Sequence, residues 1–186
     1  MVKKLVLISI MLFASNMNAE ILKDKIIVLE TSEGNIIIHL DARRAPITVE
    51  NFINLVKSDY FDGSIFHRVI ENFMIQGGGF DSNMNDLESS KKIPNESGNG
   101  LSNLRGTISM ARTSDPHSAN AQFFINTKDN RSLNPKSGRW GYAVFGTVIE
   151  GMDVVDRISK KPTGPKGRFM SDVPVETVLI KDILIE

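Results

Sequence analysis

The chain has 186 residues, a length that fits one domain, and its 22 basic and 22 acidic side chains leave no formal net charge. A neutral chain argues against a nucleic-acid binder that depends on a basic surface. Hydrophobic residues make up 41% and charged residues 24%, which indicates a globular domain rather than a disordered chain. Cysteine is absent, which excludes disulfides, zinc–thiolate sites, iron–sulfur clusters and thiol nucleophiles.

The first 19 residues have the pattern of a secretory signal peptide. Lys3 and Lys4 precede an apolar run at 5–14, about half the length that spans a bilayer, and Ala19 is a suitable residue before a cleavage site. We therefore expect residues 1–19 to be a signal peptide and residues 20–186 to be the exported domain, with no membrane span after cleavage. A buried N-terminal helix or an uncleaved anchor is the alternative interpretation of this segment.

Apolar, β-branched runs separated by turns follow the signal segment and predict about eight strands. We place them at residues 26–30, 36–40, 65–70, 73–76, 107–111, 122–126, 142–149 and 175–185. Residues 77–105 are rich in Gly, Ser and Asn and predict a long loop, which in a compact domain usually has a function.

Two helices are expected between the strands. Pro46 suits a first helical position, and an apolar face follows it with the spacing of a helix, formed by Val49, Phe52, Ile53 and Val56. A shorter apolar pattern predicts a second helix around residues 152–158. Because the strands do not alternate with helices, they favour a mainly β fold: a closed, eight-stranded antiparallel β-barrel with helices at its ends.

The sequence gives little support to metal, phosphate-loop or triad chemistry. The three histidines, His39, His67 and His117, lie in separate segments without a second ligand at metal-binding spacing, so no metal site is expected. The glycine run at 77–79 lacks the Gly-Lys-Ser/Thr that would complete a phosphate loop, and no GxSxG elbow is present. We expect an activity that requires no cofactor.

Four segments place polar side chains inside apolar strands. They read FHRVI at 66–70, FMIQGG at 73–78, SMAR at 109–112 and QFFIN at 122–126. A side-chain period of two puts Arg68 on one face with Ile70, and Gln122 on one face with Phe124. If one such residue occurred alone, the simpler interpretation would be structural: Arg68 and Gln122 would form a buried pair, and the aromatic residues would belong to the core. The four segments together form a far more specific pattern than any one of these residues.

Together these segments resemble the cyclophilin family of peptidyl-prolyl cis–trans isomerases, and the resemblance covers essentially all of residues 24–186. The sequence MART at 110–113, the GYAVFG strand at 141–146 and the leader are similar to the bacterial exported branch of that family. The resemblance implies an eight-stranded antiparallel barrel capped by two helices, with the substrate groove on the outside of the barrel.

The same resemblance assigns expected roles to individual residues. Arg68 takes the position of the catalytic arginine, with Phe73 and Gln76 completing the expected catalytic set. The expected substrate-binding residues are Met74, Ala111, Arg112, Gln122, Phe124, Leu133 and Tyr142. The proline ring would lie against the apolar members, and the substrate backbone against the two glutamines. Trp140, the only tryptophan, is expected to pack against the barrel.

Isomerisation of an X–Pro bond requires no nucleophile and no metal, because no covalent bond is made or broken. Twisting the amide gives the prolyl nitrogen a lone pair, to which an arginine can donate a hydrogen bond. We expect a monomeric isomerase that acts on unfolded or flexible proline-containing polypeptides in the periplasm, with no nucleic-acid partner. The alternative is a proline-peptide-binding chaperone or scaffold with little catalysis, which would not need a cation at Arg68.

Overall fold

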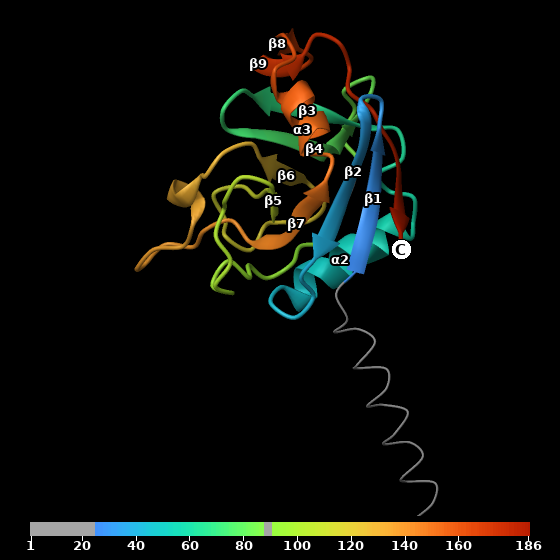
Figure 1. Cartoon of the computed structure of the whole chain (residues 1–186). Coiled ribbons are helices and arrows are strands. Elements are labelled where there is room, and N and C mark those ends of the chain that lie inside the picture. Colours follow the sequence, from blue (N-terminus) through green and yellow to red (C-terminus); the bar gives the residue numbers. More distant parts are fainter. Residues whose placement is uncertain (1–24, 88–90) are drawn as a thin grey trace, which may run out of the picture.

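The computed structural model describes residues 25–87 and 91–186, so the expected signal peptide at 1–19 lies outside the described residues. Eight strands form one antiparallel sheet in the order β10-β1-β2-β7-β5-β6-β4-β3 (Figure 1). Their bounds are β1 (Lys25–Thr31), β2 (Gly34–Leu40), β3 (Ser64–Ile70), β4 (Met74–Asp81), β5 (Thr107–Met110), β6 (Phe123–Asn126), β7 (Val144–Glu150) and β10 (Ile180–Ile185). The mainly β, eight-stranded antiparallel fold expected from the sequence is therefore confirmed.

The barrel is nearly closed rather than closed, which corrects the expectation. Its edge strands β3 and β10 are joined by isolated links instead of a continuous ladder. The N–H of Phe66 donates to the carbonyl of Val178 and the N–H of Gly63 to that of Ile180, each at 3.0 Å. Residues 175–179 were expected to belong to the last strand, but β10 begins at Ile180.

Two α-helices, α2 (Pro46–Val56) and α3 (Met152–Ser159), pack against the sheet at the positions expected from the apolar spacing. In Figure 1, α2 crosses the lower end of the barrel and α3 lies near its upper end. The Phe52 ring of α2 enters the core, with its centroid 5.0, 5.6 and 5.3 Å from those of Phe61, Phe123 and Phe145. The first helix thus anchors the aromatic centre of the domain. None of the helices in the described ranges has the length and apolarity needed to cross a membrane.

The N-terminus of α2 is capped by a residue distant in sequence. Its N-cap, Ala45, offers no side-chain acceptor. The carboxylate of Glu96 accepts hydrogen bonds from the N–H groups of Ile47 at 3.2 Å and Thr48 at 2.8 Å, and from the Thr48 hydroxyl at 2.6 Å. The segment expected to be a long loop therefore fixes the end of the helix that anchors the core.

Two features differ from the sequence prediction. The glycines at 77–79 belong to β4 rather than to a loop. Side chains from other segments leave little room there: aromatic rings approach Gly77 and Gly78, and the Gln122 side chain approaches Gly79. A Cβ atom on Gly78, whose φ is +78°, would lie 2.9 Å from the Phe61 ring and 3.1 Å from that of Phe123. A second, unpredicted sheet is formed by β8 (Thr163–Lys166) and β9 (Phe169–Pro174), and this hairpin packs against β3.

Candidate active site

A bulge in β3 places Arg68 on the outer face of the barrel. Phe66 pairs with Gly77 and Arg68 with Gln76, so β3 advances two residues while β4 advances one. The extra residue reverses the side-chain alternation, so that Phe66 and Val69 both face the core while Arg68 faces outward. The Arg68 side chain is 39% exposed there.

A groove of about 290 Å³ opens beside Arg68 on this outer face. Residues from β3, β4 and β6 and from the segments that flank β5 and β7 form its walls. They are Arg68, Phe73, Met74, Gln76, Ala111, Arg112, Phe124, Leu133 and Tyr142. Met74 and Phe124 are almost fully buried, yet they lie outside the hydrophobic core cluster, because they form the apolar floor of this groove. Nine of the ten expected site residues are thus brought together.

The tenth expected residue, Gln122, lies at the edge of the groove and not in it. Its side-chain oxygen accepts a hydrogen bond from Nε2 of Gln76 at 2.9 Å. It also lines a neighbouring hollow of about 320 Å³, which shares Gln76, Ala111 and Arg112 with the groove. Gly79 makes room for Gln122, because a Cβ atom at Gly79 would overlap the Gln122 side chain.

Arg112 acts mainly as a brace on one wall of the groove. Its Nε donates to the carbonyl of Gly141 at 3.2 Å, and its Nη2 to that of Trp140 at 3.0 Å. Its guanidinium also lies 4.6 Å from the centre of the Tyr142 ring, which in turn packs edge-on against Phe124 at 5.7 Å. Arg112 therefore holds the aromatic wall and the backbone before it in place.

Trp140 is more exposed than expected for an aromatic residue packed against the barrel. The residue is 46% exposed, and its ring lies beside that of His117, with the centroids 5.2 Å apart. The sequence GRWGY at 138–142 belongs to the segment that joins the 3-10 helix Arg131–Leu133 to β7.

The titratable groups beside Arg68 come from two elements, β9 and β3. Oδ2 of Asp172 on β9 lies 3.7 Å from Nε of Arg68. His67, the next residue along β3, is buried between the rings of Phe80 and Phe169. The pKa of His67 is lowered from 6.5 to about 4, mainly by burial and also by the nearby Arg68 and Arg168, against contributions from hydrogen bonds that raise it. The ring beside Arg68 is therefore neutral near pH 7.

Sequence reasoning missed the second hollow and the Asp172 carboxylate. The hollow includes Lys92, Thr113, Ser118 and Asn120, which lie in the segments joining the strands. Asp172 lies in the hairpin whose strands were not predicted, so no sequence signal linked it to Arg68. Among the described residues, no group of three His, Cys, Asp or Glu side chains could hold a metal ion.

Known proteins match this chain along most of its length. Residues 26–183 match the family described as cyclophilin type peptidyl-prolyl cis-trans isomerase/CLD. A peptidyl-prolyl cis-trans isomerase of Acinetobacter baylyi is 48% identical over 179 residues, covering 96% of this chain and 95% of that protein. Peptidyl-prolyl cis-trans isomerase B of Escherichia coli is 47% identical over 163 residues, covering 86% and 98%.

The fold also matches solved structures. A Cryptosporidium parvum cyclophilin type peptidyl-prolyl cis-trans isomerase, whose crystal structure was determined in the presence of the dipeptide Ala-Pro, superposes with a TM-score of 0.69. Its sequence is 27% identical, and the match covers 87% of this chain and 98% of that one.

Proposed function

Since this chain belongs to the cyclophilin-type peptidyl-prolyl cis–trans isomerase family and is an isomerase of X–Pro bonds, we propose that the groove beside Arg68 is its active site. The family match and the relatives confirm the activity expected from the sequence. The observation that carries the site assignment is a guanidinium on the outer face of the barrel, directly beside an apolar floor formed by Met74 and Phe124.

The physical task is to lower a rotational barrier. The peptide bond resists rotation by about 18–20 kcal/mol, because resonance gives it double-bond character. A catalyst must therefore bind the twisted amide better than either planar form. As the bond twists, the prolyl nitrogen becomes pyramidal and gains a lone pair, and Arg68 donates a hydrogen bond to it.

The other groove residues hold the substrate while the bond turns. The proline ring packs against Phe73, Met74, Phe124 and Leu133, so that the carbonyl side of the bond is the part that rotates. The linked carboxamides of Gln76 and Gln122 face the substrate backbone as hydrogen-bonding groups. The Ala-Pro dipeptide in the crystal structure of the Cryptosporidium relative supports the choice of proline peptides as ligands.

We further propose that the enzyme works on exported proteins in the periplasm as a monomer, after removal of a signal peptide at 1–19. The basic start, the short apolar run and the small residue Ala19 support this proposal. Intact-mass measurement of protein from its native host tests the processing. A mature chain beginning at Glu20 supports export, whereas retention of residues 1–19 contradicts it.

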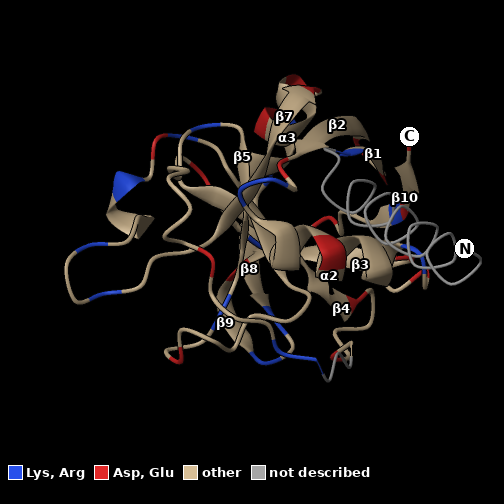
Figure 2. Ribbon diagram, turned by 90° about the horizontal axis from the view of Figure 1, so that it is seen from below, with Lys and Arg blue, Asp and Glu red and all other residues tan. Residues whose placement is uncertain are grey.

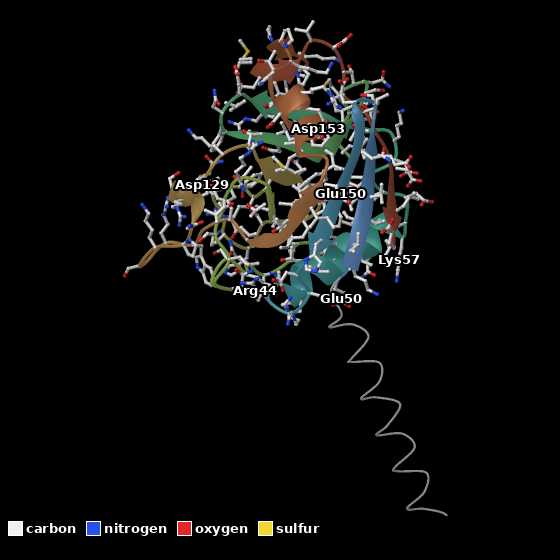
Figure 3. All side chains as sticks on the ribbon, viewed as in Figure 1. Arg44, Glu50, Lys57, Asp129, Glu150 and Asp153 are labelled. Carbon is white, nitrogen blue, oxygen red and sulfur yellow. The ribbon has the colours of Figure 1, made fainter. Side chains whose placement is uncertain are left out.

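An exchange-NMR isomerisation assay on a short Ala-Pro peptide tests the site. Arg68→Ala should lower kcat/KM by about 100-fold or more, the size found when a transition-state hydrogen-bond donor is removed. Arg68→Lys should restore little, because an ammonium does not reproduce the guanidinium geometry. Arg44→Ala, an exposed arginine paired with Asp41 (Figure 3), is the matched control and should keep full activity. Near-normal catalysis by Arg68→Ala would favour the groove as a peptide-binding module only.

A further inference from the structure

Residues 131–140, which we call the basic loop, project from the side of the barrel (Figure 1). The loop begins with the 3-10 helix Arg131–Leu133 and continues into a turn. This turn is closed by reciprocal backbone hydrogen bonds between Lys136 and Arg139, at 3.0 and 2.9 Å. The loop is therefore ordered by its own hydrogen bonds, and its base is part of the groove wall because Leu133 lines the groove.

The charge of the basic loop is of one sign. Arg131, Lys136 and Arg139 are exposed, and residues 130–149 contain no Asp or Glu, although the whole chain is formally neutral. Figure 2 shows this projecting loop with basic residues and no acidic ones. Asp129, labelled at the base of the loop in Figure 3, is its nearest carboxylate, with Oδ2 3.9 Å from Nη2 of Arg131.

The outer two cations are not neutralised. In the part of the chain that the structure describes, neither Lys136 nor Arg139 has a carboxylate within 4.0 Å. Nη2 of Arg139 donates instead to the neutral carbonyl of Ser132 at 2.8 Å. Both side chains line a shallow hollow of about 340 Å³ together with the exposed indole of Trp140. The hollow therefore offers positive charge beside an apolar surface.

The basic loop is held firmly against the groove. The N–H of Tyr142 donates to the carbonyl of Leu133 at 2.9 Å, and Arg112 donates to the carbonyls of Trp140 and Gly141. Gly141 packs so closely that a Cβ atom there would overlap the backbone of residues 133–135. A polypeptide leaving the groove over Leu133 therefore meets a fixed positive surface.

We propose that the basic loop extends the substrate site and selects client segments that carry Asp or Glu a few residues away from the proline. The proposal rests on the assignment of the groove as the active site. Lys136 is three residues from Leu133, so its Cα lies within roughly 11 Å of the groove wall. An extended client crosses that distance in about three residues, which sets the expected position of its carboxylates. Complementary charges at such a rim attract the partner and are screened by salt.

A matched set of X–Pro peptides tests the proposal. One member is neutral, two carry a Glu pair two to four residues before or after the proline, and two carry Lys pairs at the same places. Exchange NMR gives kcat/KM for each peptide at low and at high salt. At least one Glu peptide should exceed the neutral one by about 3-fold or more, the Lys peptides should not, and 0.5 M salt should remove the difference.

Charge reversal then identifies the surface. In the double variant Lys136→Glu/Arg139→Glu, the Glu-to-neutral ratio should fall to about one or below, because the attraction becomes repulsion. Lys57→Glu, an exposed lysine just after α2 (Figure 3), is the matched control and should keep the wild-type ratio.

The possible outcomes separate this proposal from the site assignment. Equal rates for all peptides, or a Glu preference that survives in the double variant, overturn the role of the basic loop and leave the groove assignment intact. Normal turnover by Arg68→Ala overturns the groove assignment. Even if Arg68→Ala turns over normally, titration of the same peptides into labelled protein still tests the basic loop. The charge preference is then the ratio of the affinity for a Glu peptide to the affinity for the neutral peptide.

Discussion

Nε of Arg68 lies 3.7 Å from Oδ2 of Asp172, so a carboxylate from the β8–β9 hairpin faces the guanidinium of the groove from outside the barrel. The two side chains are 39% and 34% exposed, respectively. A half-exposed pair of this kind contributes little to the stability of the fold. Because the contact involves Nε, it leaves the Nη groups as the donors that Arg68 can offer to a ligand in the groove. We therefore predict that Asp172 positions Arg68.

Asp172→Asn should lower kcat by about 2- to 5-fold with little change in KM, the range expected for loss of one exposed ion pair. Asp172 has a φ of +69°, and Asn tolerates that left-handed conformation, so the hairpin should keep its shape. Asp182→Asn on β10 is the control. A loss that appears in KM alone, or in the melting temperature, would assign Asp172 a structural role instead.

The contact between Gly79 and Gln122 predicts a variant that damages the site while sparing the fold. In Gly79→Ala, the new methyl group must displace the Gln122 side chain, which can move because it is long and flexible. The Gln76–Gln122 hydrogen bond should break, so peptide affinity and kcat/KM should fall several-fold, as for the loss of about 1 kcal/mol.

Gly164→Ala on β8 is the matched control, because its Cβ would meet only Val175 at 3.9 Å. Peptide titration and thermal melting of both variants decide the matter. If Gly79→Ala melts well below the wild-type protein while its peptide affinity is unchanged, the glycine serves packing and not the site.

The cap on α2 predicts a stability effect that the loop sequence alone would not suggest. Glu96→Gln should lower the free energy of unfolding by about 1 kcal/mol, since it removes one anionic acceptor at a helix N-terminus. Urea unfolding measures this loss. Glu50→Gln, on the exposed face of the same helix (Figure 3), should change stability far less. Equal effects of the two substitutions would show that general charge, and not the hydrogen bonds to Ile47 and Thr48, is responsible.

Patterns within single segments predicted most of the fold. β-Branched runs marked the strands of the barrel, and Pro46 with its apolar face marked α2, because local periodicity follows from which side chains the core buries. The β8–β9 hairpin was missed because Thr163–Lys166 has neither alternation nor β-branched residues beyond its first. The extent of β4 was missed because its glycines are required by side chains from other segments, aromatic rings at Gly77 and Gly78 and Gln122 at Gly79, which a local pattern does not contain.

In the candidate site, too, local patterns were predicted from the sequence, whereas contacts between distant segments were not. The polar residues inside apolar strands, above all Arg68, were visible as departures from a core pattern. The bulge that turns Arg68 outward depends on the register between β3 and β4, and the Asp172 carboxylate depends on where the hairpin packs. Both are tertiary relationships, so sequence spacing alone did not contain them.

The burial of His67 predicts how stability depends on pH. Its pKa is about 4 in the folded protein and 6.5 in the unfolded chain, so between these values the unfolded state binds more protons. The free energy of unfolding should therefore fall as the pH drops from about 6.5 to about 4, by up to about 3 kcal/mol. Well above pH 6.5 the ring is neutral in both states and contributes no slope.

The groups around His67 explain why its pKa is lowered in the folded protein. Burial between Phe80 and Phe169 is the main cause, and the positive charges of Arg68 and Arg168 act the same way. Among the described residues its Nδ1 has no hydrogen-bond partner, and the hydrogen bonds with the Ile65 backbone and the Gln122 side chain, which raise the pKa, do not outweigh burial. Urea unfolding at pH 7.5, 6, 5 and 4.5 measures the slope, and His67→Gln should flatten it across this window. NMR titration of the His67 ring in the unmodified protein gives an independent reading. A midpoint near 6.5 in the folded state would contradict the prediction, as would an equal slope in His67→Gln.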